Sequence, residues 1–479
     1  MTSNFSASKT WGRLSKAKFE IGGEDQLAPL NREFPAEPTD DPTKARLETA
    51  WKEFTKSTRI RIGTLLKSDN ISFLFGAGAS KEAGGILLGN VPKEIETKLL
   101  ARGINAESAS GWLKLFYEAV RSLAPAQIKD SVTDAWVRQR LNNFATEGPL
   151  AVNYEEVLAC LYRWRAVLSG DGDSFQLGPE PGIKISASDL QSAIKEAKAS
   201  LISVCDLPAQ KDDPDSLNVH KEFLKKVLTR PLNLKRANIF SLNYDTMLEQ
   251  AADAEGIVLV DGFIGTISRA FRPESFDQDL YFPAETTEGR VHRLERVLHL
   301  YKLHGSVNWV SQEPTWNNPY GISCSLAAAQ SDDSILIYPT PSKYGEVLGM
   351  PYAEIFRRFA ASVVRRQSTL FVIGYGFGDE HVNAIIRQAL AIPSFSLIIV
   401  DPFAPNADSK SGFVASLRSQ NDRRVWVVSG ESLGVFSQFV QTLLPDLRDE
   451  EILGKVMKTY KSLGGTEDPY ASPASENAE

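Results

Sequence analysis

The first residues that could do chemistry form the glycine-rich motif GAGAS, which directly follows the apolar run ISFLF. A glycine-rich turn between a strand and a helix lets backbone N–H groups and the helix N-terminus approach a pyrophosphate. The candidate binding residues in this motif are Gly76, Ala77, Gly78 and Ser80. The alternative is a tight turn that needs glycine only for its backbone angles.

A second motif, SLNYD, follows the apolar run ANIF and contains Asn243 and Asp245. Open α/β sheets bind ligands at the carboxyl ends of their strands. There, short polar side chains could hold the hydroxyl groups of a ribose or a water molecule. Asn and Asp are also common in turns and at helix N-caps, so a purely structural role remains open.

A third motif, YKLHGS, places His304 after an apolar segment and directly before Gly305. The unperturbed pKa of histidine suits a general base near neutral pH, and a following glycine would let a substrate approach the ring. A single histidine is more often structural. The other histidines have no comparable setting and are assigned to the surface or to packing: His220, His292, His299 and His381.

The fourth motif is a second glycine turn, in which Gly374, Tyr375 and Gly376 follow the apolar run TLFVI. It could hold another phosphate or a ribose at the far side of the same crevice. The next apolar run, FSLIIV, ends at Asp401, which could accept hydrogen bonds from adenosine hydroxyls. Asp379 could cap the helix that follows it.

The elements that would position these motifs alternate between apolar strands and helices, which predicts an α/β fold with a doubly wound, Rossmann-like parallel sheet. This sheet is expected to be built from residues 41–94 and 233–445, interrupted by a helical insertion over 95–232. Residues 1–40 are expected to form a flexible arm, and 446–479 a C-terminal helix and flexible tail.

Charge and cysteine content exclude several classes of function. The net charge of −7 provides no overall positive field for nucleic acid or an anionic membrane. The three cysteines, Cys160, Cys205 and Cys324, form no CxxC pair and are too few for a four-cysteine zinc site. No signal peptide or membrane span is recognised, and a cytoplasmic protein without zinc is expected. With no cluster of carboxylates that would bind a metal, a nuclease is the weakest interpretation.

The four motifs, GAGAS, LNYD, KLHGS and IGYGFGD, occur in the order in which sirtuin-like proteins carry corresponding motifs. The chain therefore resembles the sirtuin-like family over about residues 71–401. The resemblance implies that NAD lies across the sheet ends, with the GAGAS turn near its pyrophosphate. Asp401 and the Gly374–Gly376 turn would then face the adenosine half.

Two departures from sirtuin deacetylases change the expected reaction. The Pro-Asp-Phe-Arg element expected after the first turn is replaced by GGILLGN, and the four-cysteine zinc module is missing. Both differences argue against protein deacetylation. The pattern is closer to the sirtuin-like effectors of bacterial antiphage defence that destroy NAD, including those of the Thoeris type and those paired with a HerA-type ATPase.

The expected function is hydrolysis of NAD to nicotinamide and ADP-ribose as an antiphage effector. By this resemblance Asn243 would hold the attacking water or the ribose hydroxyls, His304 would act as general base, and Asp245 would order the neighbouring hydrogen bonds. Because unrestrained hydrolysis of NAD would harm the cell, we expect the activity to be controlled by homo-oligomerisation or by a partner such as a HerA-type ATPase. The alternatives are an NAD-dependent protein deacylase and a sensor that binds NAD or ADP-ribose without cleaving it.

Overall fold

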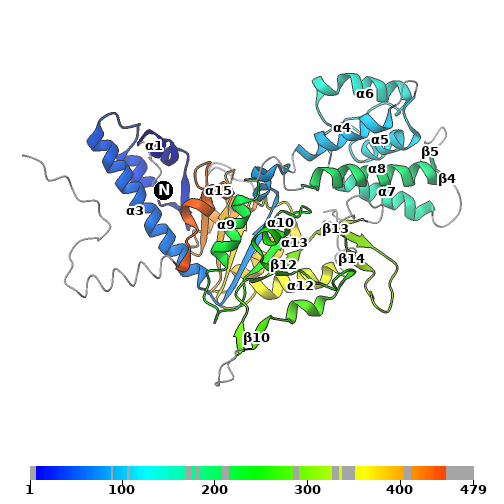
Figure 1. The fold of residues 1–479 in the computed structure, drawn as a ribbon. Helices are drawn as coiled ribbons and strands as arrows, with labels where there is room; N and C mark the ends of the chain where they lie inside the picture. Colours follow the sequence, from blue (N-terminus) through cyan, green and yellow to red (C-terminus); the bar gives the residue numbers. More distant parts are fainter. Residues whose placement is uncertain are drawn as a thin grey trace, which may run out of the picture.

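The computed structural model has a central sheet with helices on both faces and a helical unit at one side of it (Figure 1). The described residues are 7–87, 90–104, 108–152, 154–168, 174–177, 183–207, 215–283, 291–325, 334–336, 351–403 and 412–448.

The central sheet is nine-stranded, in the order β2-β1-β18-β17-β16-β3-β6-β12-β7. Every neighbouring pair from β18 to β7 is parallel, whereas β1 runs antiparallel to β18 and β2. The strands are β1 (Lys18–Ile21), β2 (Glu24–Asp25), β3 (Asn70–Phe75), β6 (Asn238–Ser241), β7 (Val258–Val260), β12 (Val297–Lys302), β16 (Ser368–Ile373), β17 (Ser396–Val400) and β18 (Val425–Ser429). From β3 the sheet continues through β6 and β12 on one side and through β16 and β17 on the other. The direction of the strand order therefore changes at β3.

Both faces of this sheet are buried, as the continuous apolar strand runs require. On β3, Phe73 and Phe75 belong to one hydrophobic cluster and Leu74 belongs to the other. The first cluster also contains side chains of α3 (Asp41–Leu66), α9 (Asn218–Val227) and α10 (Met247–Glu255). The second contains side chains of α12 (Tyr352–Val363), α13 (Glu380–Leu390) and α14 (Phe413–Ser419). The predicted doubly wound α/β fold is therefore confirmed.

A smaller sheet of five strands, in the order β15-β13-β14-β9-β8, adjoins this core. Its strands are β8 (Phe263–Ile264), β9 (Arg269–Phe271), β13 (Gly305–Ser311), β14 (Ile322–Cys324) and β15 (Ser334–Leu336). Since β13 begins at Gly305, the residue after His304, the chain passes from the large sheet to the small one at the predicted histidine motif.

The helical insertion lies to one side of the central sheet (Figure 1), and its helices share a hydrophobic cluster that also includes Val307 of β13. Its helices are α4 (Val91–Gly103), α5 (Gly111–Leu123), α6 (Asp134–Glu147), α7 (Tyr154–Leu168) and α8 (Ala187–Cys205), and a short hairpin joins β4 (Ser174–Leu177) to β5 (Ile183–Ser186). The buried Arg140 guanidinium pairs with Glu96 at 2.8 Å, and the Tyr117 hydroxyl donates to the same carboxylate.

None of the helices in the described ranges has both the length and the apolar character that a membrane span requires.

One helix inside the predicted insertion range belongs to the sheet instead. Phe223, Leu224 and Val227 of α9 are fully or almost fully buried, and they pack in the same cluster as Phe73 and Phe75. The ring of Phe223 meets those of Phe73 and Phe75 edge-on, with centroids 5.1 and 5.0 Å away. The composition of α9 resembles that of the insertion helices, so only these tertiary contacts distinguish it.

The N-terminal region differs from the flexible arm expected over residues 1–40. It contains α1 (Ala7–Ser15), β1, β2 and α2 (Ala28–Glu33), and β1 extends the central sheet through its pairing with β18. Phe19 of β1 is fully buried against Phe54 and Trp426. Leu14, Leu27 and Phe34 are buried in the same core, but they are spread through a polar segment that hid the strand. The predicted C-terminal tail lies outside the described residues from 449 onward.

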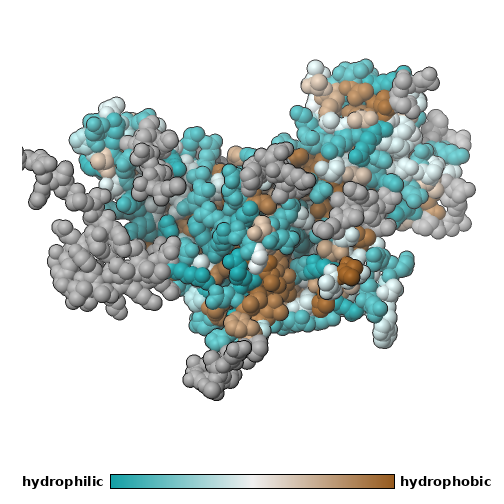
Figure 2. All heavy atoms as spheres, viewed as in Figure 1, coloured by the Kyte–Doolittle hydropathy of each residue, from teal (hydrophilic) through white to brown (hydrophobic). Residues whose placement is uncertain are grey.

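Apolar side chains are also exposed near the β7 edge of the sheet. Val258 on β7 and Leu280 and Phe282 at β10 (Tyr281–Pro283) are at least 40% exposed. Figure 2 shows a patch of apolar side chains near β10 on a mostly hydrophilic face. This edge therefore carries an apolar surface beside a mostly hydrophilic one.

Two buried histidines should make stability depend on pH. Burial lowers the pKa of His220 and of His299 to about 4 each. One ring nitrogen of each, Nδ1 of His220 and Nε2 of His299, has no hydrogen-bond partner among the described atoms. In the unfolded chain both rings should titrate near their ordinary pKa of about 6.5.

Between these values only the unfolded state takes up the protons, so stability is complete above about pH 6.5 and falls as the pH decreases towards 4. We expect each histidine to account for a loss of about 2 kcal/mol in the free energy of unfolding between pH 7 and pH 5. Urea titrations of the wild type and of His220→Phe at both pH values would measure this. An unchanged pH dependence in the variant would contradict the assignment.

Candidate active site at the carboxyl ends of the central strands

The sheet order brings all four predicted motifs to one edge. The glycine motif GAGAS follows β3, Asn243 follows β6, His304 follows β12 and Gly374 follows β16. These strands are neighbours in the order β16-β3-β6-β12 and are parallel, so their carboxyl ends lie together. The reversal of strand order at β3 places the motifs where doubly wound sheets bind ligands.

The two glycine turns contact each other directly. The backbone N–H of Gly78 donates to the carbonyl of Gly374 at 2.8 Å, and that of Gly76 donates to Ile373 at 2.9 Å. An added Cβ at Gly76 would lie 2.6 Å from the Gly374 oxygen, which is closer than real contacts allow. The Gly374 turn therefore lies against the first turn and does not face it across a crevice, as the sequence led us to expect.

The first turn has few spare donors for a pyrophosphate. The N–H groups of Gly76 and Gly78 bond to the β16 segment, while those of Ala79 and Ser80 bond to the carbonyls of Gly76 and Ala77 within the turn. The turn is built of two short 3₁₀ segments, Ala77–Ala79 and Lys81–Ala83. The glycines of this turn thus allow its backbone to pack closely against the backbone of Gly374 and Tyr375.

Gly374 should be intolerant of substitution, whereas Gly376 two residues later should not. Gly374 has φ of +64°, and a Cβ there would lie 2.4 Å from the Ala79 nitrogen, but a Cβ at Gly376 meets nothing within 4 Å. We expect Gly374→Ala to lower the free energy of unfolding by about 3 kcal/mol. We expect Gly376→Ala to change it little. Equal effects in urea titrations of the two variants would contradict this packing of the turns.

Asn243 is held in one orientation by its amide nitrogen. Nδ2 donates to the carbonyl of Gly76 and to the hydroxyl of Ser80, each at 3.0 Å. The backbone N–H of Asn243 donates to the Ser241 hydroxyl at 3.1 Å. Because both Nδ2 protons are committed, Oδ1 is the atom with which the amide can accept a hydrogen bond from a ligand.

Ser80 and Asp245 hold the Asn243 side chain in place through a chain of hydrogen bonds. The buried Ser80 hydroxyl donates to Oδ2 of Asp245 at 2.6 Å while it accepts from Asn243. The other oxygen of Asp245 accepts from the N–H of Met247 at 3.1 Å, at the start of α10. Asp245 thus connects the hydrogen bonds around Asn243 to the first residue of α10. The hydroxyl of Ser80 is directed to these two side chains.

A buried ion pair behind Asp245 was missed by sequence reasoning. Lys302, 3% exposed, donates to the backbone carbonyl of Asp245 and pairs with Glu249 at 3.3 Å. Burial raises the pKa of Glu249, and the Lys302 ammonium opposes that rise. A lysine inside the apolar segment VLHLYKL was the available signal, because a buried lysine needs a partner.

His304 forms a buried pair with Asp379. Nε2 of His304 lies 3.0 Å from Oδ2 of Asp379, and the side chains are 8% and 6% exposed. The other Asp379 oxygen accepts from the N–H of His381 at 2.9 Å and caps α13, as the sequence suggested. The contact with His304 was not predicted. It joins residues that follow β12 and β16, two strands separated by β3 and β6.

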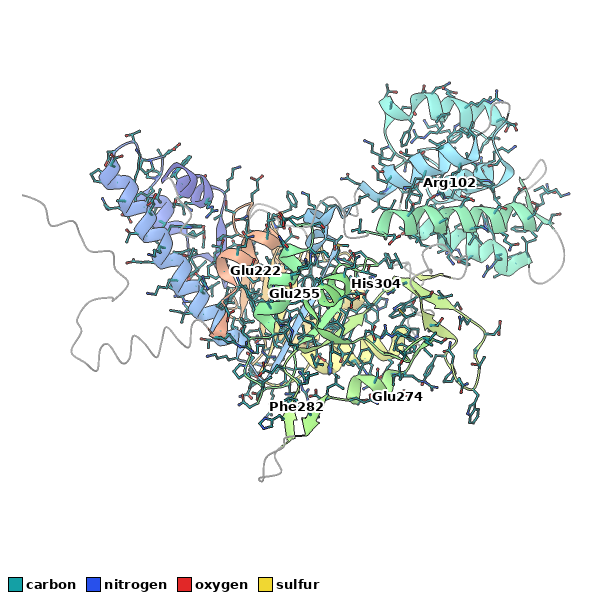
Figure 3. The ribbon with its side chains drawn as sticks, viewed as in Figure 1. Arg102, Glu222, Glu255, Glu274, Phe282 and His304 are labelled. Atoms are coloured by element: carbon teal, nitrogen blue, oxygen red, sulfur yellow. The ribbon has the colours of Figure 1, made fainter. Side chains whose placement is uncertain are left out.

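The loops that carry Asn243 and His304 are hydrogen-bonded to each other. The N–H of Val307 donates to the carbonyl of Tyr244 at 3.0 Å, and the Ser306 hydroxyl donates to the same oxygen at 3.2 Å. The Tyr244 and His304 rings have centroids 6.3 Å apart. The amide and the imidazole therefore lie on adjoining loops, and Figure 3 labels His304 on the side of the sheet towards the insertion.

The remaining predicted residues lie further along the sheet. The Tyr375 hydroxyl donates to the backbone carbonyl of Asp379 and accepts from its N–H, so this side chain supports the Asp379 turn. Asp401 follows β17, which β16 separates from β3, and accepts from the N–H of Phe403 at 2.7 Å. Burial raises the pKa of Asp401.

The assembled groups are suited to holding a hydroxyl or water and to transferring a proton. A buried His–carboxylate pair is suited to accepting a proton, and a fixed amide oxygen to holding a hydroxyl or water. Within the described ranges, no three His, Cys, Asp or Glu side chains are grouped so that they could hold a metal ion.

Comparison with known proteins gives a family match over part of the chain. No curated protein matches the chain. Residues 237–420 match the model of the family described as SIR2-like domain. The match begins at β6 and includes Asn243, Asp245, His304 and Asp379, whereas the first glycine turn precedes it. Over this region the chain is similar to sirtuin-like proteins, whose activities are related to NAD.

Proposed function

We propose that this chain hydrolyses the nicotinamide–ribose bond of NAD and releases nicotinamide and ADP-ribose. The observation that carries the proposal is the placement of Asn243 and His304 on adjoining loops, at the ends of the neighbouring parallel strands β6 and β12. Both residues lie in the region similar to SIR2-like domains. A site that only bound a dinucleotide would not need a buried His–carboxylate pair.

In the proposed reaction the bond to nicotinamide breaks first and leaves an oxocarbenium-like ribose, as in glycoside hydrolysis. Oδ1 of Asn243 accepts a hydrogen bond from the attacking water or a ribose hydroxyl. His304 takes the proton from that water or hydroxyl. Ser80, which itself donates to Asp245, and the carbonyl of Gly76 keep the Asn243 amide in place.

Water is the proposed acceptor because the sequence has neither the Pro-Asp-Phe-Arg element nor the four-cysteine zinc module of sirtuin deacetylases. The test is to incubate the purified protein with NAD, with and without an acetylated peptide, and to identify the products. Release of ADP-ribose and nicotinamide without peptide supports hydrolysis. Nicotinamide release that requires the peptide would instead identify a deacylase, and NAD binding without turnover a sensor.

We further propose that the protein is a cytoplasmic antiphage effector whose activity is controlled by homo-oligomerisation or a HerA-type ATPase. The hydrophobic cluster of the insertion includes Val307, and Tyr244 packs against it. These residues flank His304 and Asn243, so a partner that shifts the insertion helices would disturb the catalytic loops. This control would be contradicted if the rate of NAD hydrolysis per protein molecule were the same at every protein concentration, and the same with and without the candidate ATPase.

A further inference from the structure

The contact between His304 and Asp379 determines which imidazole nitrogen carries the proton. Oδ1 of Asp379 accepts from the N–H of His381 at the start of α13, where the helix dipole favours a negative charge. An ionised carboxylate only accepts hydrogen bonds. In the neutral ring the proton therefore lies on Nε2, 3.0 Å from Oδ2 of Asp379, and the basic lone pair lies on Nδ1.

The chain reaches this contact by a specific route. The loop from Gly374 to Asp379 starts at the end of β16 and ends beside His304, which follows β12. On the way it passes directly against Gly76 and Gly78, where any Cβ would collide with its backbone. The Tyr375 hydroxyl then bonds to both the N–H and the carbonyl of Asp379. Asp379 is thus fixed by its backbone as well as by its cap.

We propose that Asp379 is the positioning residue for His304. Its carboxylate holds the imidazole in the Nε2–H tautomer, so that Nδ1 is the nitrogen that takes the proton from the water or ribose hydroxyl. The role of Nδ1 as proton acceptor rests on the proposed NAD hydrolysis. The tautomer is inferred from the contact with Asp379 and does not depend on that function.

The variant Asp379→Asn separates this role from a structural one. Asparagine is as good an N-cap as aspartate, so its Oδ1 can keep the bond to the His381 N–H. Its amide group then presents N–H donors to His304, which favours the opposite tautomer and moves the basic lone pair to Nε2. We expect kcat for NAD hydrolysis to fall by about 10³-fold or more, with KM changed less than about twofold and an unchanged melting curve.

Asp40→Asn is the matched control. Asp40 also caps a helix, since its carboxylate accepts from the Thr43 N–H at 2.8 Å at the start of α3, but it lies at the surface and outside the candidate site. Its replacement should leave kcat unchanged. If Asp379→Asn also keeps wild-type kcat while His304→Ala is inactive, the positioning role is refuted and the proposed hydrolysis stands.

A spectroscopic readout tests the tautomer without any activity. The chain has five histidines, so selective ¹⁵N labelling of their rings gives few signals, and His304→Gln identifies those of His304. At about pH 8, where an unperturbed imidazole is neutral, a protonated Nε2 and an unprotonated Nδ1 are expected in the wild type. The reverse pattern is expected in Asp379→Asn. A wild-type ring protonated at Nδ1 would overturn the proposal even if NAD is not the substrate.

Discussion

Replacing Asn243 with alanine is expected to lower the rate of nicotinamide release from NAD by about 10²–10³-fold, the usual effect of removing one pre-oriented polar group from an active site. The amide of Asn243 is fixed by Gly76 and Ser80, so its Oδ1 needs no reorganisation to hold the water or the ribose hydroxyl. Steady-state assays of nicotinamide release measure the loss, and thermal melting checks that the variant is folded.

Asn238→Ala provides the comparison for this variant on the same strand. Asn238 begins β6, at the end opposite to Asn243, and its Nδ2 donates to the Ser362 hydroxyl at 3.3 Å. Its replacement should leave the rate of nicotinamide release unchanged. Equal rates for wild type and Asn243→Ala would remove Asn243 from the mechanism.

Replacing His304 with alanine is expected to lower kcat by about 10²–10⁴-fold because the general base is lost. The buried position of the ring means that the variant leaves a space of imidazole size next to Asp379. Added imidazole should therefore restore part of the activity in His304→Ala. The same assay in the wild type, with imidazole at the same concentration, measures any effect of imidazole that does not depend on the missing side chain.

His299→Ala is the matched histidine variant for this experiment. His299 lies on β12, three residues before Lys302 ends the strand, and is largely buried near Tyr301. Its loss should alter stability and leave kcat at the wild-type value. If His299→Ala reduced kcat as strongly as His304→Ala, the loss would reflect damage to β12 and the general base would have to lie elsewhere.

Much of the fold could be predicted because its central strands are continuous apolar runs. The runs that became β3, β16 and β17 are buried on both faces, and burial of this kind is visible in composition. The strand β1 could not be found in this way. Its segment is polar: the buried Glu20 carboxylate pairs with Arg418 and Lys18, and pairing with β18 and β2 makes the segment a strand.

The candidate site was predicted as a set of strand ends but not as a set of contacts. Asn243 and His304 could be found because each follows an apolar run with a short polar motif. The pairing of His304 with Asp379 depends on a loop that reaches past two intervening strands. The local sequence does not show this path, because the glycines that permit it fit a tight turn as well as a phosphate-binding turn.

The most direct test of the proposed function is NAD turnover by the purified protein over a series of protein concentrations, with Asn243→Ala and His304→Ala in parallel. We expect equimolar nicotinamide and ADP-ribose from the wild type, over many turnovers, and almost none from either variant. Intact NAD after prolonged incubation with folded wild type at every concentration, or products formed equally by all three proteins, would contradict it.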